Sequence, residues 1–229
     1  MLTQRPDTIR AAAYATALTL AASALPAFAH HVMGGQMPQT FGQGLLSGVG
    51  HPLIDIGHFA FVIAVGITAA LTGRIWTLTI AFVAGTLAGC FVHLAGITLP
   101  VAELVIAATV LLLGAIIATN RELSTLILAI MFAAAGLFHG WAYGESIIGA
   151  EQTPLSGYLL GFTLVQLLVA VLAARVTRWL MTGGETAMQG KVRLAGAVVA
   201  GIGVALFIGQ IEGVLIPTPP AVTAATTVH

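Results

Sequence analysis

His51, Asp55 and His58 stand close together at the start of a long apolar stretch, GVGHPLIDIGHFAFVIAVG, which covers residues 48–66. Imidazole nitrogen and carboxylate oxygen are ligands for late first-row divalent metals such as Ni, Co, Zn and Cu. On a continuous helix, Asp55 lies about 40° from His51, and His58 lies about 20° to the other side. The spacing therefore predicts one helical face with three metal-binding side chains. Alternatively, Asp55 orients a ligating histidine without touching the metal.

The proline beside His51 fits the same prediction. Pro52 lacks a backbone N–H, so it is best placed in the first turn of a helix, where that group would have no partner. We therefore expect the first membrane helix to begin at this point, with His51 near its N-cap.

The composition indicates an integral membrane protein. The chain has 229 residues, of which 58% are hydrophobic and 7% charged, and its mean hydropathy is +1.01. Soluble domains carry about 25% charged residues, so this chain has too few to cover a surface that faces water. Its formal net charge of zero gives no electrostatic basis for nucleic acid as a partner. Cys90 is the single cysteine, which excludes an intrachain disulfide and a Cys-rich metal site.

The first 29 residues have the pattern of a secretory signal peptide. Arg5 and Arg10 form a short basic region, an apolar core follows, and AFA ends at Ala29. Cleavage there leaves a mature chain that begins with His30 and His31. The alternative is an uncleaved first membrane helix, although the apolar core is short for a span of about 20 residues.

Six further apolar segments predict an all-α, polytopic membrane protein, a compact bundle of six transmembrane helices. The segments cover residues 51–72, 75–97, 100–119, 123–142, 155–178 and 191–213. Small residues recur in AGTLAG, FAAAGLFHG and AGAVVAGIG, so we expect close contacts between helices. The predicted organisation is a signal peptide (1–29), a periplasmic His/Met/Gly leader (30–50), the six-helix domain (51–213) and a flexible periplasmic tail (214–229).

The basic residues predict the orientation. If the mature N-terminus is periplasmic, six spans place all basic residues that follow the signal peptide on the cytoplasmic side, as the positive-inside rule requires. These residues are Arg74, Arg121, Arg175, Arg178, Lys191 and Arg193. We therefore expect a multi-pass membrane protein with its N- and C-termini outside the cytoplasm, which is the periplasm if the membrane is the bacterial inner membrane.

This topology gathers the histidines in the outer half of the membrane. Ionisable groups are costly there and mark ion paths. The predicted metal ligands are His51, Asp55, His58, His93 and His139, and the predicted capture or pathway residues are His30, His31, Glu103, Glu145 and Gln166. A lone membrane histidine can instead bond a neighbouring helix, and Glu103 can instead complement a helix dipole. Trp76, Trp141 and Tyr143 are expected as interfacial aromatic anchors.

No motif in the chain indicates an enzyme. The sequence has no Walker A motif, dinucleotide-binding loop, nucleophile elbow or HExxH helix. Any transport must therefore be driven by a gradient or by an outside partner.

Several motifs resemble those of the HupE/UreJ family of bacterial membrane proteins. SGVGHPLIDIGHFAFVIAVG resembles the first-helix signature, His-Pro-x-x-Gly-x-Asp-His, at His51, Pro52 and His58. LPVAELVIAATVLLLG and FHGWAYGES resemble the third and fourth spans, which carry Glu103, His139 and Glu145, and RLAGAVVAGIGVAL resembles the last span. The resemblance covers essentially the whole mature chain.

The chain departs from this family in two respects. Asp55 and Gly57 stand in the reverse of the family order, so Asp55 does not simply inherit the role of the family aspartate. Many members also have a histidine near Tyr143 and another near Gln166, so this chain has fewer imidazoles.

The resemblance implies a permease that takes up Ni²⁺, or secondarily Co²⁺, as a transported ion for hydrogenase or urease. It implies no permanently bound cofactor. The lipid bilayer, an outer-membrane metal receptor and metalloenzyme maturation proteins are the expected partners. The alternative is an accessory protein, chaperone or sensor, that binds metal without transporting it. The inner half of the predicted bundle has few ionisable groups, which favours that alternative.

Overall fold

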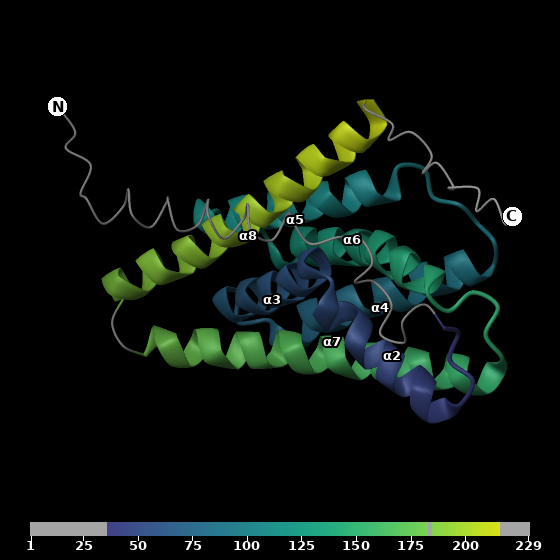
Figure 1. The fold of residues 1–229 in the computed structure, drawn as a ribbon. Coiled ribbons are helices and arrows are strands. Elements are labelled where there is room, and N and C mark those ends of the chain that lie inside the picture. Colours follow the sequence, from purple (N-terminus) through teal and green to yellow (C-terminus); the bar gives the residue numbers. More distant parts are fainter. Residues whose placement is uncertain (1–35, 183–184, 216–229) are drawn as a thin grey trace, which may run out of the picture.

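A computed structural model describes residues 36–182 and 185–215, and all the secondary structure it assigns there is helical (Figure 1). This confirms the predicted all-α class. The helices are α2 (Phe41–Ile54), α3 (Ile56–Leu71), α4 (Ile75–Leu94), α5 (Ala102–Ala118), α6 (Thr125–Glu145), α7 (Gln152–Met181) and α8 (Glu185–Leu215). The predicted signal peptide, with His30 and His31, and most of the predicted tail lie outside the described residues.

The helices define a multi-pass membrane protein. In the described chain, four helices are long and apolar enough to cross a membrane: α4, α6, α7 and the Gln189–Leu215 part of α8. The bent pair α2 and α3 counts as a fifth span if its two helices are taken together, and Ala102–Ala118 is a shorter apolar helix. The described residues thus contain four or five candidate spans, and a sixth remains a prediction.

The expectation of one continuous helix over residues 51–72 is wrong. A helix begins ten residues earlier, at Phe41, where Thr40 and Gln43 form a capping box. It ends at Ile54, and α3 leaves at 81° to it. Asp55 between them has an extended backbone, with φ −75° and ψ 115°. Residues 41–50, assigned to the leader, are therefore helical.

The bend changes the predicted positions of the side chains around it. His51 and Pro52 lie near the C-terminal end of α2 and not at a helix start. His51 and His58 belong to different helices, so the common helical face predicted for them with Asp55 does not exist. The physical reason is that the Asp55 side chain serves as the N-cap of a new helix, which fixes where the chain turns.

The second of these helices, α3, forms the centre of the bundle. Of its 16 residues, 12 are buried. A helix that faced lipid along its length would have more exposed side chains, so α3 is surrounded by protein. Figure 1 shows α3 between α7 on one side and α5 with α8 on the other. Its apolar side chains pack with Phe82 of α4, Leu113 of α5 and Phe132 of α6. Most of the large exposed apolar side chains lie on the surrounding helices, as at Leu126 and Trp179.

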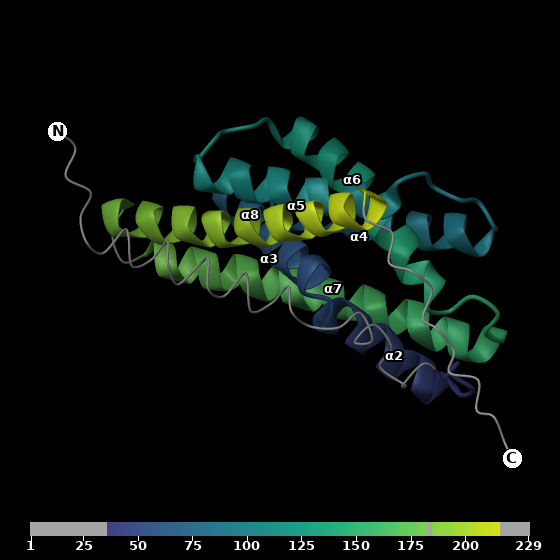
Figure 2. The ribbon, with the colours of Figure 1, turned by 45° about the horizontal axis from the view of Figure 1, so that its top comes forward.

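Glycines allow the helices to approach closely in pairs. A Cβ atom on Gly85 or Gly89 of α4 would collide with the backbone of α6, and one on Gly136 or Gly140 of α6 would collide with α4. The same relation joins α5 to α8 and α2 to α7, pairs that lie side by side in Figures 1 and 2. The close packing predicted from the small residues is confirmed.

The basic residues meet at one end of the bundle. Arg175 and Arg178 of α7 line a cavity with Gly73 and Ile75, the neighbours of Arg74. Arg121 lines another cavity with Leu71 and Thr72 at the end of α3, and Lys191 lines a third with Leu180 near the end of α7. The Nε of Arg193 donates a hydrogen bond to the carbonyl of Ala118. We call this the basic end of the bundle.

The helix seams predict a stability difference between two glycines. Gly85→Ala places a methyl group against the carbonyl oxygen of Ala133 and should destabilise the protein by about 1–3 kcal/mol. Gly209→Ala, the matched control on α8, meets nothing within 4 Å and should leave stability unchanged or slightly raised. Thermal unfolding of the purified proteins in detergent, followed by circular dichroism, measures both. Equal midpoints would contradict the account of the α4–α6 seam.

Candidate metal centre

Asp55 fixes the position of His58. Its Oδ1 accepts a hydrogen bond from the backbone N–H of His58 at 2.9 Å, which caps α3. The same oxygen lies 3.0 Å from His58 Nδ1. A carboxylate can only accept, so the neutral imidazole carries its proton on Nδ1 and has a lone pair on Nε2. Among the described residues, His58 Nε2 is a buried atom with no hydrogen-bond partner.

Thr109 fixes His139 in the opposite tautomer. The hydroxyl of Thr109 donates to the carbonyl of Ile106 at 2.7 Å and lies 3.0 Å from His139 Nε2. Because its single proton is already donated, the hydroxyl accepts from Nε2–H, which leaves the lone pair on Nδ1. His139 is fully buried, and its Nδ1 also has no hydrogen-bond partner within the described part of the chain.

These two histidines, with Tyr143, form the candidate centre. The ring centroids of His58 and His139 are 4.9 Å apart, and those of His58 and Tyr143 are 4.5 Å apart. Tyr143 is fully buried, and its hydroxyl is a third atom without a partner in the described structure. An unpartnered buried polar atom typically costs about 1–3 kcal/mol, and here three belong to adjacent rings. Two neutral imidazoles and a phenol are chemically suited to a divalent transition metal.

His51 stands beside this centre at the end of α2. Its ring centroid is 6.3 Å from that of His58 and 5.1 Å from that of Tyr143. Its Nδ1 lies 3.0 Å from the Ser146 hydroxyl and 3.3 Å from the Tyr158 hydroxyl. Tyr158 in turn donates to the carbonyl of Tyr143 at 2.7 Å. His51 is thus held next to the pair by side chains from α7 and from the residue after α6.

The other predicted ligands are placed differently. His93 Nδ1 lies 2.7 Å from the carbonyl of Trp141, and the two rings are 4.1 Å apart, so its contacts are with α6 and not with the paired histidines. Cys90 is buried in an apolar cluster with Tyr143 and Tyr158. Among the described residues, no group of three or more His, Cys, Asp or Glu side chains is arranged to hold a metal ion. The five predicted ligands therefore do not meet at one point.

The predicted pathway residues are also divided. Gln166 is fully buried, and its amide donates to the Phe162 carbonyl at 3.0 Å and to the Thr86 hydroxyl at 3.4 Å. Its Oε1 is a further buried atom without a partner among the described residues. Glu145 is exposed at the end of α6, and Glu103 lines an apolar cavity at the start of α5.

Several residues of the centre were not predicted from the sequence. Tyr143 was expected as an interfacial anchor, which is wrong, because it is fully buried beside His58. Its position four residues after His139 puts the two on one helical face, a signal that could have identified it. Thr109, Ser146 and Tyr158 had no comparable signal, because they reach the histidines from other segments of the chain.

Comparison with known proteins identifies the class and then the family. The fold is that of a multi-pass membrane protein with a buried pair of histidines. The family model described as HupE / UreJ protein matches residues 17–206, and the chain belongs to this family. It is 34% identical over 193 residues to Protein HupE of Rhizobium leguminosarum bv. viciae, an alignment that covers 83% of this chain and 96% of that protein. No solved structure matches the chain.

This assignment confirms the resemblance noted in the sequence. Proteins of the HupE/UreJ family are generally nickel or cobalt transporters or accessory proteins of hydrogenase or urease, and they are not known as enzymes.

The hydrogen bonds of the paired histidines predict two different tautomers. In the metal-free protein, ¹⁵N NMR of labelled histidine should find His58 protonated at Nδ1 and His139 protonated at Nε2. Thr109→Val removes the acceptor for His139, so its signals should change, whereas Thr109→Ser retains the hydroxyl and should preserve them. If the Val variant matched the wild type, Thr109 would not determine the tautomer.

Proposed function

We propose that this chain is a permease that carries a divalent transition metal ion across the bacterial inner membrane from the periplasm. Nickel is the first candidate and cobalt the second, for the maturation of hydrogenase or urease. The observation that supports this most is a pair of buried imidazole nitrogens, His58 Nε2 and His139 Nδ1, that have no hydrogen-bond partner among the described residues. In each ring the other nitrogen carries the proton, so these two nitrogens have free lone pairs. Neutral imidazole is the state that binds metal.

The proposed binding site consists of His58 and His139, with Tyr143 as a further oxygen donor and His51 at its entrance. The positions of Asp55 and Thr109 suit residues that orient the two imidazoles, since ligating histidines generally donate their second N–H to an acceptor. His93 is left out of this site because its ring contacts Trp141. His30 and His31 are proposed to capture the ion before it reaches His51.

The orientation is part of the proposal. The basic end of the bundle is proposed to face the cytoplasm, and the end with His51 and Asp55 to face the periplasm. The distribution of Arg and Lys supports this through the positive-inside rule.

A second candidate function is that of an accessory protein that binds metal and does not transport it. The observation in its favour is the packing of Phe61 against His139, Phe82 and Phe132, which puts apolar rings beside the paired histidines. A protein of this kind would bind nickel in detergent but move none into proteoliposomes.

Metal uptake by cells tests the proposed site. His58→Ala and His139→Ala each remove one of the two paired ligands. Loss of a residue that only hydrogen-bonds a metal ligand costs roughly tenfold in metal affinity or activity, so loss of a ligand itself should lower nickel accumulation by more than that. His93→Ala, the matched change outside the proposed site, should retain most of it. Uptake is measured at equal membrane levels with competition among Ni, Co and Zn. Unchanged uptake in both paired-histidine variants would refute the site.

A further inference from the structure

One cavity at the basic end of the bundle has two guanidinium groups in an otherwise apolar wall. It has a volume of about 390 Å³, within the range of about 300–1,000 Å³ that is typical of ligand pockets. It lies between the start of α4 and the last turns of α7. The residues that line it are Gly73, Ile75, Trp76, Val171, Arg175 and Arg178. The described residues thus give this cavity a positive charge and no carboxylate.

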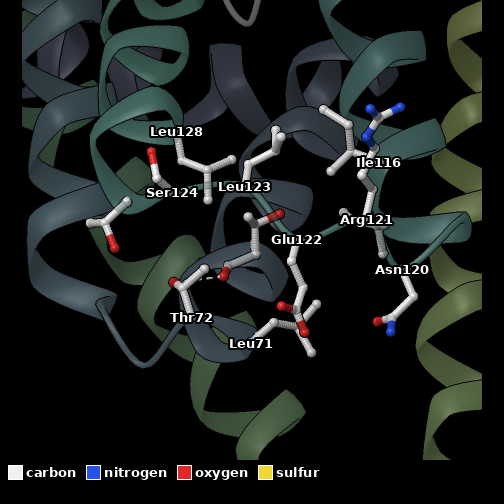
Figure 3. Close-up of a pocket in the computed structure, with 12 residues that line it drawn as sticks. Leu71, Thr72, Ile116, Asn120, Arg121, Glu122, Leu123, Ser124 and Leu128 are labelled. Atoms are coloured by element: carbon white, nitrogen blue, oxygen red, sulfur yellow. Dashed lines mark hydrogen bonds between the residues drawn. The ribbon is translucent and has the colours of Figure 1, made fainter.

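A neighbouring cavity at the same end has a different charge. Figure 3 shows that Arg121 lines this second cavity together with Glu122, so a guanidinium and a carboxylate share one space. The two charges offset each other, and the second cavity does not select an ion by its charge. Arg121 is therefore a matched control for the arginines of α7.

The two arginines of the first cavity have no counter-charge. Arg175 and Arg178 are three residues apart on α7, a spacing that places Cβ atoms about 5–6 Å from each other. The ion pair formed within the described residues joins His58 to Asp55 and involves no arginine. Like charges at this spacing repel each other, and an anion between them removes that repulsion. Arginine suits a phosphate in particular, because its planar fork of N–H groups matches the phosphate oxygens.

The start of α4 contributes to the same positive region. The first N–H groups of a helix have no partner within the helix, and a side chain at the N-cap commonly supplies one. The N-cap residue of α4 is Arg74, which makes no such side-chain hydrogen bond. Ile75 and Trp76, the first residues of α4, line the cavity. The positive end of this helix dipole therefore lies at the cavity together with the two guanidinium groups.

The length of α7 places the cavity at the depth of the lipid headgroups. This helix has 30 residues and is about 45 Å long, whereas the hydrocarbon core of a bilayer is about 30 Å thick. The ends of α7 therefore extend beyond the hydrocarbon, and Arg175 and Arg178 lie in its last two turns. Trp76 and Trp179 are exposed beside them, and tryptophan is enriched where the membrane meets water.

We propose that this cavity binds the phosphate of an anionic phospholipid, held by Arg175, Arg178 and the N-terminus of α4. The acyl chains of the lipid lie along exposed apolar side chains of α7, such as Leu172 and Val176. A free phosphate ion would meet the same donors but would gain nothing from this apolar surface, so the proposal commits to a lipid. It goes beyond the proposed metal function and does not depend on it.

Native mass spectrometry of the purified full-length chain tests the site. Phosphatidylglycerol is the probe, and zwitterionic phosphatidylcholine with the same acyl chains is the comparison. The wild type should bind phosphatidylglycerol more tightly, and an excess of inorganic phosphate should not displace it. One basic residue near anionic lipid is worth roughly a fivefold change in binding, so Arg175→Gln or Arg178→Gln should weaken binding roughly fivefold and the double variant roughly 25-fold. Arg121→Gln should leave binding unchanged, and Arg175→Lys should retain most of it.

The fluorescence of Trp76 gives a second reading that needs no arginine variant. In bilayers, phosphatidylglycerol with brominated acyl chains should quench the protein more than brominated phosphatidylcholine does. Trp76→Phe should remove this excess quenching, whereas Trp141→Phe, a change outside the cavity, should retain it. This measurement decides the matter if the glutamine variants do not fold.

Four outcomes would overturn the proposal. Equal binding, or equal quenching, of the two lipids by the wild type would show that the cavity does not recognise the charge. An equal loss in Arg121→Gln and Arg175→Gln would show that the general charge of the basic end attracts the lipid. Displacement of phosphatidylglycerol by inorganic phosphate would show that the site takes a free anion. None of these outcomes bears on nickel binding, so each leaves the proposed metal function as it stands.

Discussion

The hydrogen bonds of the Asp55 carboxylate are the constraint on which the rest of this structure depends. One oxygen caps the backbone of α3 and also binds the Nδ1–H of His58. The first contact ends α2 and sets the direction of the central helix, and the second decides which nitrogen of His58 faces the other rings. A single side chain therefore links the bend in the backbone to the chemistry of the candidate centre.

The bundle around this helix is arranged so that polar groups can be buried. Three glycine seams bring α4 to α6, α5 to α8 and α2 to α7, and this close packing surrounds α3 with protein instead of lipid. Polar groups in a membrane are tolerated where they face such an interior. His139, Gln166 and Tyr143 are all fully buried there. The small residues therefore contribute to function indirectly, because they allow the centre to exist.

The sequence predicted the class of fold and the most informative residues, but not their arrangement. Composition identified a membrane protein, and the motifs around His58 and His139 identified the family. The common face of His51, Asp55 and His58 was wrong because helical arithmetic assumes an unbroken helix. Asp55 is the residue near the break with the strongest preference for an N-cap, which is a sign of a new helix start. The sequence is apolar on both sides of Asp55, so it was interpreted as one continuous membrane helix. Contacts such as that of Thr109 with His139 join segments thirty residues apart, which no local pattern reports.

The central claim is that His58 and His139 together bind the metal, and X-ray absorption spectroscopy of the purified, nickel-loaded protein tests it most directly. Imidazole ligands give a characteristic outer-shell scattering pattern whose amplitude counts the rings bound. The account predicts at least two imidazoles on nickel in the wild type, and one fewer in His139→Ala. Nickel without imidazole scattering, or the same spectrum in His139→Ala as in the wild type, would contradict it.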